Sequence, residues 1–203
     1  MSVVWLRSPV GLGRATAVLL GVVVAAQLFG VGTDALLYDA YGGAGRVRDV
    51  ELLYNVGAVV QGVSLVPTAV VYLCWFWRVR TNAEVFEPGG HSKKRGWAIG
   101  GWFIPFVNLW VPRRVMGDIW RASAPLGRPA SQALVNAWWT AWVLWLVISR
   151  FANVHDRSAS TLTELRQVAG ETLVTDLVGA VAAGLAILVV VRVTRMQDEK
   201  AHV

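Results

Sequence analysis

The stretch TLVTDLVGAVAAGLAILVVV, which runs from Thr172 to Val191, contains a single charged residue, Asp176. A helix needs about 20 consecutive apolar residues to cross the hydrocarbon of a bilayer, and this stretch is that long. Three further stretches of the chain are as poor in charge. Because helices satisfy their own backbone hydrogen bonds in lipid, the sequence predicts an all-α membrane protein. Its core is a four-helix transmembrane bundle with spans at about residues 15–37, 54–77, 131–150 and 172–192.

The composition agrees with this interpretation. Of the 203 residues, 55% are hydrophobic and 16% are charged, whereas an average soluble domain has about 25% charged residues. This balance excludes a disordered tail and an ordinary water-soluble enzyme. The lone cysteine, Cys74, leaves no intrachain disulfide and no multi-cysteine metal site. We therefore expect residues 1–203 to form a single integral membrane domain.

The first span has a rival interpretation. Arg7 and Arg14 precede an apolar run that contains Val24-Ala25-Ala26, a sequence similar to a signal-peptidase site. The run continues to Thr33, which makes it longer than the core of about 7–15 residues that signal peptides have. We expect the segment to be retained as a membrane anchor.

A fifth apolar stretch, residues 96–112, is ambiguous. It is interrupted by Gly100, Gly101, Pro105 and Asn108, and it contains the tryptophans Trp97, Trp102 and Trp110. Tryptophan is typical of membrane interfaces, and a run this short and broken suits an interfacial or re-entrant segment better than a crossing. A crossing is the alternative, and it would invert the topology of everything that follows.

Lysine and arginine are unevenly distributed between the two sides of the predicted bundle. The N-terminal segment, the loop 78–130 and the C-terminal tail hold 14 of the 19 basic residues. Cytoplasmic loops collect Lys and Arg, so we expect both termini and this loop in the cytoplasm, with the loop against anionic headgroups of the lipid bilayer. Topology thus accounts for the net charge of +6, and no nucleic-acid partner is expected.

The basic residues are 16 arginines and only 3 lysines. This skew is typical of a GC-rich bacterial genome. We therefore expect a multi-pass protein of the bacterial cytoplasmic (inner) membrane.

Polar residues inside the predicted spans follow helical stripes. Gln27 and Asp34 are seven residues apart in the first span, as are Gln61 and Thr68 in the second. This spacing brings two side chains to the same face of a helix. Such groups are costly toward lipid, so these faces should point into the bundle. We interpret them as interhelical hydrogen bonds, with a substrate or ion path as the alternative.

Three ionisable residues complete this candidate intramembrane polar cluster. Arg150 and Asp176 lie near the ends of the third and fourth spans, at the same membrane face as Asp34. An unpaired charge at that depth costs about 1–3 kcal/mol. We expect an ion pair between one of the two carboxylates and Arg150, or one of the outer-loop arginines Arg46 and Arg48.

The sequence offers no catalytic constellation. The histidines His91, His155 and His202 lie outside the predicted spans, and none belongs to a cluster with metal-ligand spacing. There is no P-loop, no G-x-S-x-G nucleophile elbow and no dinucleotide-binding fingerprint. We therefore predict no catalytic residues, no cofactor and no metal, and a protein that is not an enzyme.

The most distinctive text of the chain is rich in tryptophan and proline. It reads WFWRVRTN at residues 75–82, GWAIGGWFIPFVNLWVP at 96–112 and DIWRAS at 118–123. This text resembles the bacterial, mostly actinobacterial, membrane family called domain of unknown function 4328. The resemblance covers residues 75–123 well and the tryptophan-rich third span more loosely, and Arg113 stands where we expect an aromatic residue. It implies a membrane protein and carries no activity, cofactor or catalytic residue.

The same region predicts a basic surface at the cytoplasmic side. Residues 113–122 place Val115, Ile119 and Trp120 on one side of a helix and charged residues on another, which predicts an amphipathic cytoplasmic helix. With the interfacial segment it forms a candidate lipid or partner platform; an anchoring belt is the alternative. The platform residues are Arg78, Arg80, Asn82, Trp97, Trp102, Asn108, Trp110, Arg113, Arg114, Asp118, Trp120 and Arg121.

Two functions compete at this point. The leading hypothesis is a non-enzymatic scaffold or accessory protein that binds anionic lipid, a membrane-protein partner or a second copy of itself through the platform. The alternative is a small transporter or channel subunit that uses the polar faces of the first two spans. A lipid-modifying enzyme ranks third, because no nucleophile and base are paired in the sequence. A continuous polar cavity would favour transport, and a dry bundle would favour the scaffold.

Overall fold

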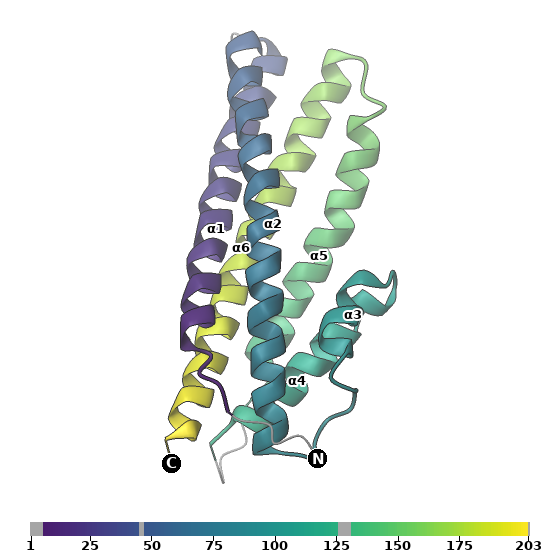
Figure 1. Ribbon diagram of the computed structural model, residues 1–203. Helices are drawn as coiled ribbons and strands as arrows, with labels where there is room; N and C mark the ends of the chain where they lie inside the picture. Colours follow the sequence, from purple (N-terminus) through teal and green to yellow (C-terminus); the bar gives the residue numbers. More distant parts are fainter. Residues whose placement is uncertain (1–5, 45–46, 126–130, 203) are drawn as a thin grey trace. The chain divides into compact units, whose positions relative to one another are not determined.

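The computed structural model describes residues 6–44, 47–125 and 131–202, and every regular element in these ranges is a helix (Figure 1). The four long helices are α1 (Val10–Asp39), α2 (Val47–Phe86), α5 (Ala133–Asp156) and α6 (Leu162–Ala201). The shorter elements are the π turn η1 (Ala40–Ala44), α3 (Trp97–Phe103), the 3-10 turn η2 (Val107–Leu109) and α4 (Val111–Ser123). The four long helices are each long and apolar enough to cross a membrane. The predicted helical membrane bundle is confirmed.

Each predicted span coincides with one long helix, but the helices extend further. Helices α2 and α6 have 40 residues each, which corresponds to about 60 Å, or about twice the thickness of the hydrocarbon. Residues 78–86 were expected in a loop, yet they continue α2. The reason is that no helix-breaking residue occurs until Pro88.

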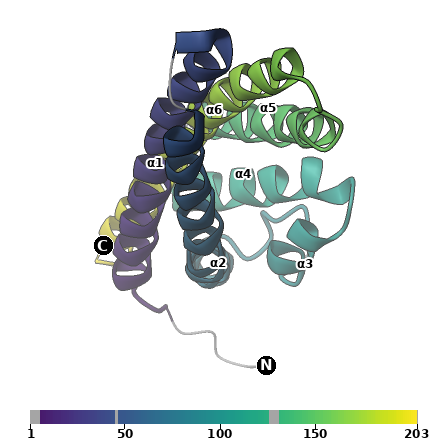
Figure 2. The same ribbon diagram turned by 90° about the horizontal axis from the view of Figure 1, so that it is seen from above.

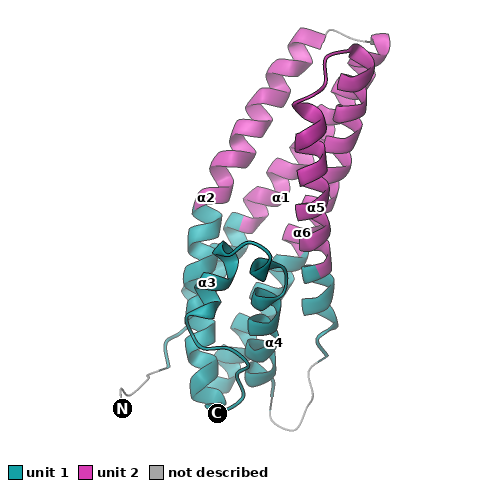
Figure 3. Cartoon of the chain, turned by 90° about the vertical axis from the view of Figure 1, so that its right-hand side faces the viewer, with its two compact units in different colours: residues 1–19, 67–139, 185–203 teal, residues 20–66, 140–184 magenta. Residues whose placement is uncertain are grey.

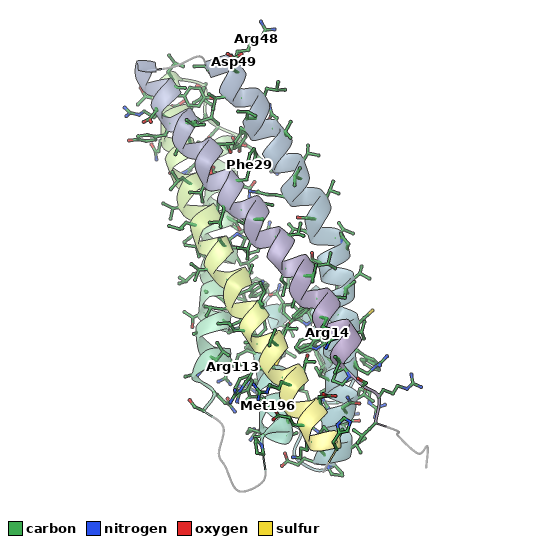
Figure 4. The ribbon with its side chains drawn as sticks, turned by 90° about the vertical axis from the view of Figure 1, so that its left-hand side faces the viewer. Arg14, Phe29, Arg48, Asp49, Arg113 and Met196 are labelled. Atoms are coloured by element: carbon green, nitrogen blue, oxygen red, sulfur yellow. The ribbon has the colours of Figure 1, made fainter. Side chains whose placement is uncertain are left out.

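One face of α2 carries large apolar side chains that the described part of the chain leaves exposed. Val59, Val63, Val66 and Val70 are each 57–67% exposed, and their spacing of four, three and four residues places them on one side of the helix. Apolar side chains also project outward along the other long helices (Figure 4). A surface of this kind is suited to lipid.

The described chain divides into two compact units, which we treat separately (Figure 3). Unit 1 contains residues 1–19, 67–139 and 185–203, and unit 2 contains residues 20–66 and 140–184. Helices α1, α2, α5 and α6 each contribute a segment to both units.

Unit 1 has an aromatic and aliphatic core. Trp75 and Phe76 of α2 are fully buried, and the Trp75 Nε1 atom donates a hydrogen bond to Thr194 Oγ1 of α6 at 2.9 Å. Gly13 of α1 faces the same threonine, and a Cβ at Gly13 would lie 2.8 Å from Thr194 Cγ2. A glycine at this position therefore allows α1 and α6 to approach closely.

The segment 96–112 folds back within unit 1. Helix α3 has seven residues, which corresponds to about 10 Å and is too short to cross a membrane. The chain then turns at Phe106, which has a positive φ of 63°, and α4 packs beside α3 (Figure 2). Gly101 makes room for this packing, because a Cβ there would lie 2.8 Å from Val111 Cγ1. The segment therefore contains no helix long enough to cross, as its interruptions predicted.

Unit 2 contains the two turns that join the long helices in pairs. The turn after α1 uses Gly43, whose φ of 96° favours glycine. Helix α6 begins with a capping box: Glu164 N donates to Thr161 Oγ1 at 3.3 Å, and Thr161 N donates to Glu164 Oε2 at 3.0 Å. Arg48 and Asp49 project from the beginning of α2 (Figure 4).

Candidate functional site

Polar side chains from α1, α2, α5 and α6 surround a cavity of about 200 Å³ inside unit 2. Four of the lining residues, Val23, Ala26, Leu65 and Ala152, are apolar. The others can all form hydrogen bonds, and they are Gln27, Tyr54, Gln61, Ser64, Trp145, Ser149, Asn153, Asp156, Thr172, Thr175 and Asp176. A polar lining of this extent is unusual in a helical membrane bundle, where such groups are expensive.

The contact between α2 and α6 at this cavity is a hydrogen bond. Gln61 Nε2 donates to Asp176 Oδ2 at 2.7 Å and also to the carbonyl of Ala26 at 3.3 Å. Asp176 is only 7% exposed. On α1, Gly30 lies directly against both polar groups, and a Cβ there would overlap Asp176 Oδ2 and Gln61 Nε2. The absence of a side chain at Gly30 therefore provides the space that the pair occupies.

Gln27 brings an unsatisfied polar atom to the cavity wall. Its side chain is 5% exposed, and its Oε1 atom has no hydrogen-bond partner among the described residues. Gly179 of α6 accommodates this amide, because a Cβ there would lie 2.9 Å from both Gln27 Nε2 and Trp145 Nε1. A buried acceptor without a partner costs free energy, and the adjacent cavity is where a partner would fit.

Asp34 is completely buried, and neither carboxylate oxygen accepts a hydrogen bond from a described residue. It lies one helical turn from Gly30 on α1, and its charge interacts with that of Asp176. Tyr54 of α2 lines the same cavity as Asp156 of α5 and Asp176 of α6.

A second cavity of about 190 Å³ adjoins the first toward the turn between α1 and α2. The two cavities share Tyr54, Asp156 and Thr172. The second cavity adds Glu51, whose Oε1 atom accepts a hydrogen bond from Tyr41 at 3.0 Å. The lining of both cavities includes acids and no Lys, Arg or His among the residues that the structure describes.

The predicted polar cluster is assembled in part. Gln27, Gln61 and Asp176 line the cavity, and Asp34 lies next to them. Thr68 is buried in unit 1 and does not line the cavity. Arg150 is exposed and does not line it either.

The expected ion pair is not found in the described part of the chain. Neither Asp34 nor Asp176 pairs with Arg150 or Arg48, and Asp176 accepts from Gln61 instead. Arg46 lies outside the described residues. The prediction for Arg150 is wrong because its side chain turns to the outside of α5, one position after Ser149, which faces the cavity.

Several lining residues were missed by the sequence reasoning. On α5, Ser149, Asn153 and Asp156 follow one another at spacings of four and three, a polar stripe like those recognised in the first two spans. They lie near the end of the third predicted span, where polar residues are common, so their spacing did not indicate a face that points into the bundle. Tyr54 was missed for the same reason, since it begins the second predicted span.

The candidate platform falls in unit 1, and four of its residues are buried there: Arg80, Asn82, Asp118 and Trp120. Arg80 is 1% exposed; it forms an ion pair with Glu84 at 2.8 Å and donates to the carbonyl of Lys93 at 2.8 Å. Arg95 also pairs with Glu84. Burial alone would raise the pKa of Glu84, which lies beyond the predicted span, but the hydrogen bond from Arg95 and the charge of Arg80 hold that pKa below its ordinary value.

Asn82 and Gln197 form the centre of a second buried network. Asn82 Nδ2 donates to the carbonyl of Arg7 at 2.8 Å and to Gln197 Oε1 at 3.1 Å. Gln197 Nε2 donates to Ser123 Oγ at 3.0 Å and to the carbonyl of Val79 at 2.9 Å. The network joins the N-terminal segment, α2, α4 and α6. The burial of Gln197 was not predicted, because a polar residue in a predicted tail is normally exposed to water.

Helix α4 is amphipathic as predicted and begins two residues earlier, at Val111. It is packed into unit 1, and most of its residues are buried. Asp118 accepts hydrogen bonds from Ser92 N and Oγ at 2.8 and 2.6 Å and pairs with Arg121. Burial of the apolar face in the protein leaves only Arg114 and Arg121 exposed on this helix.

The other platform residues divide between internal contacts and the surface. Arg78 donates to the carbonyl of Ser8 at 3.1 Å, and Arg113 Nε donates to Asn136 Oδ1 at 3.1 Å. Trp97, Trp102 and Asn108 are half-buried, whereas Trp110 is 48% exposed. The platform is therefore less of a continuous basic surface than the sequence suggested.

Four apolar helices and a polar interior cavity define a small multi-pass helical membrane protein. The chain belongs to the family described as Domain of unknown function (DUF4328), whose family model matches residues 39–195, about three quarters of the chain. This match confirms the resemblance drawn from the tryptophan- and proline-rich text and extends it over α2, α5 and most of α6, whereas only the last residue of α1 falls within it. No curated protein and no solved structure matches the chain.

Proposed function

We propose that this protein is a small transporter or channel subunit whose solute-binding site is the polar cavity of unit 2. The observation that carries the proposal is the set of eleven residues with hydrogen-bonding side chains, from four helices, around about 200 Å³ of space. This arrangement favours the alternative function over the scaffold, because a polar cavity was the feature expected to separate them.

Simple packing of the helices does not explain the cavity. Interhelical hydrogen bonds stabilise membrane bundles, and the bond between Gln61 and Asp176 is one of them. Gln27 Oε1 and both Asp34 oxygens, however, remain without a described partner. A volume of about 200 Å³ can hold several waters, each of which takes about 30 Å³. Of these groups, Gln27 lines the cavity, so solvent or solute in this space would satisfy its unpartnered oxygen.

The adjoining second cavity supports a route to the site. It extends from Tyr54 and Asp156 to Glu51 near the turn between α1 and α2. Asp176 is 7% exposed, whereas Asp156, which both cavities share, is exposed. A solute that passed through the second cavity would meet Glu51, Tyr54 and Asp156 on its way to the site.

Cysteine accessibility tests the proposal. In a Cys74→Ser background, Ser149→Cys places a thiol on the cavity wall, and Val147→Cys places one on the exposed apolar face of the same helix. A thiol in water reacts through its thiolate, which lipid suppresses. We expect a membrane-impermeant thiol reagent to modify Ser149→Cys in vesicles much faster than Val147→Cys. Equal, slow reaction of both would show that the cavity is closed to water and would refute the proposal.

The scaffold remains a second candidate because of the turn between α3 and α4. Phe103, Ile104, Phe106 and Trp110 are 69%, 42%, 75% and 48% exposed, and Arg114 and Arg121 are exposed nearby in sequence on α4. Apolar side chains beside basic ones suit an anionic bilayer surface. A polarity-sensitive dye on Phe106→Cys, again with Cys74→Ser, should report an apolar environment in anionic nanodiscs, and one on Gly89→Cys, an exposed position with open space at Cβ, should not. Matching spectra would exclude membrane contact by this turn.

We also infer that both termini and the segment 78–130 face the cytoplasm. The distribution of Lys and Arg supports this orientation, with 14 of 19 on that side. The contacts of Asn82 with Arg7 and Gln197 support a common side for these parts, because they place the N-terminal segment and the ends of α2 and α6 together in unit 1.

A further inference from the structure

The cavity of unit 2 has an electrostatic character that points to one class of solute. Asp156 and Asp176 line it, and no basic side chain contributes to the described lining. Asp34 is buried one helical turn from Gly30, against which Asp176 packs. A carboxylate at a buried position is stabilised by a positive charge beside it, so this lining suits a cationic ligand.

Two aromatic rings line the same space. Tyr54 of α2 and Trp145 of α5 are both part of the cavity wall. The faces of aromatic rings attract cations, and the combination of carboxylates with such rings is the chemistry that recognises ammonium groups. A bare inorganic ion would occupy little of the roughly 200 Å³, whereas a small organic cation would fill it.

An independent feature shows that the cavity wall is prepared for a ligand. The Gln27 side chain is 95% buried and lines the cavity, yet its carbonyl oxygen has no described hydrogen-bond donor. An ammonium group carries donors and a positive charge, so a primary or secondary amine could be bound by Gln27 and Asp176 together.

We infer that the cavity binds a small organic cation carrying an ammonium group, with Asp176 as the principal charge partner and Tyr54 and Trp145 against its apolar part. This inference rests on the proposed function, since it names the class of solute for the same site. Asp156 adds a second carboxylate, which both cavities share.

The charge preference of cysteine modification tests the inference. The probes are two methanethiosulfonates, one with a cationic trimethylammonium group and one with an anionic sulfonate group. Each forms a mixed disulfide with the cysteine sulfur and releases methanesulfinate. The reference is Ser158→Cys, which lies in the exposed turn after α5. Relative to this reference, we expect the cationic probe to modify Ser149→Cys about tenfold faster than the anionic probe.

Substitution of the acids completes the test. Asp176→Asn keeps an acceptor for Gln61 and should reduce the cationic preference several-fold. Asp156→Asn, at an exposed position, should reduce it as well and is the second variant in case Asp176→Asn does not fold. The matched control is Asp39→Asn, an exposed acid of α1 outside the cavity lining, which should leave the preference unchanged.

The outcomes separate the inference from the proposed function. Rapid modification of Ser149→Cys by both probes, without a cationic preference, would overturn the inference and leave the solute cavity intact. A preference that survives both Asp176→Asn and Asp156→Asn would also overturn it, because the carboxylates would then not hold the charge. No modification by either probe would refute the proposed function itself.

Discussion

Gly30 is the residue on which the polar contacts of unit 2 depend most directly. The space beside it is filled by Asp176 Oδ2 and Gln61 Nε2, which are hydrogen-bonded to each other at 2.7 Å. A methyl group at this position would displace one of the two. The close approach of α1 to the polar pair therefore requires glycine for steric reasons, and its backbone conformation is that of an ordinary helix.

We expect Gly30→Ala to break the bond between Gln61 and Asp176 and to lower the free energy of unfolding by about 1–3 kcal/mol. Gly32 lies two residues further along the same helix and has open space at its Cβ position. Gly32→Ala should therefore leave stability unchanged or raise it by up to about 1 kcal/mol. Thermal unfolding in detergent, followed by circular dichroism, measures both. Equal losses in the two variants would contradict the steric argument.

The same scale shows what a sequence can and cannot predict about the site. Gln27, Gln61 and Asp176 could be predicted to face inward, because a polar side chain in the middle of an apolar run has nowhere else to go. The direction of the Arg150 side chain could not be predicted in this way. Each residue turns the helix by about 100°, so Ser149 faces the cavity while Arg150 is exposed, and a charge at a span end is stable in either direction.

At the scale of elements, segments of unit 1 that the sequence suggested to be a loop and a tail continue α2 and α6 as helices, and buried polar networks join them. Asn82 and Gln197 are 2% and 1% exposed, and they connect α2, α4, α6 and the N-terminal segment through hydrogen bonds. The continuation of α2 and α6 as helices brings these two residues within bonding distance. Hydropathy locates the apolar part of a helix well, but it says nothing about where a helix ends in water.

A double-mutant cycle tests this network. Asn82→Leu and Gln197→Leu should each cost about 1–3 kcal/mol, because each leaves buried partners without hydrogen bonds. The double variant should cost less than the sum by at least about 0.5 kcal/mol. Arg195→Ala is the control on the same helix: it removes an exposed ion pair with Glu199, and its unfolding temperature should match that of the wild type. Additive losses in the denaturant unfolding of the four cycle members would show that the two residues are not coupled.

At the scale of the whole molecule, the apolar patterning predicted the number of crossing helices, and the broken segment 96–112 was correctly kept out of that number. Its glycines and prolines indicated a turn, and α3 is too short to cross. The depth and side of this segment could not be predicted, because tryptophan and basic residues are stable at either interface. The number of crossings, in contrast, decides the topology.

With four crossings both ends of the chain lie on one side, and the positive-inside rule predicts that this side is the cytoplasm. We therefore expect a periplasmic reporter enzyme to be active when fused at Gly43 or His155 and inactive when fused at Gly90. A fusion after His202 decides between the two models of segment 96–112. With four crossings this fusion is cytoplasmic, and with five it would be outside. The contacts that join Arg7, Asn82 and Gln197 require the N-terminus, residue 82 and residue 197 to share a side. Active periplasmic reporters at both Gly90 and His202 would therefore contradict the orientation, and an active reporter at only one of the two would contradict the packing of unit 1.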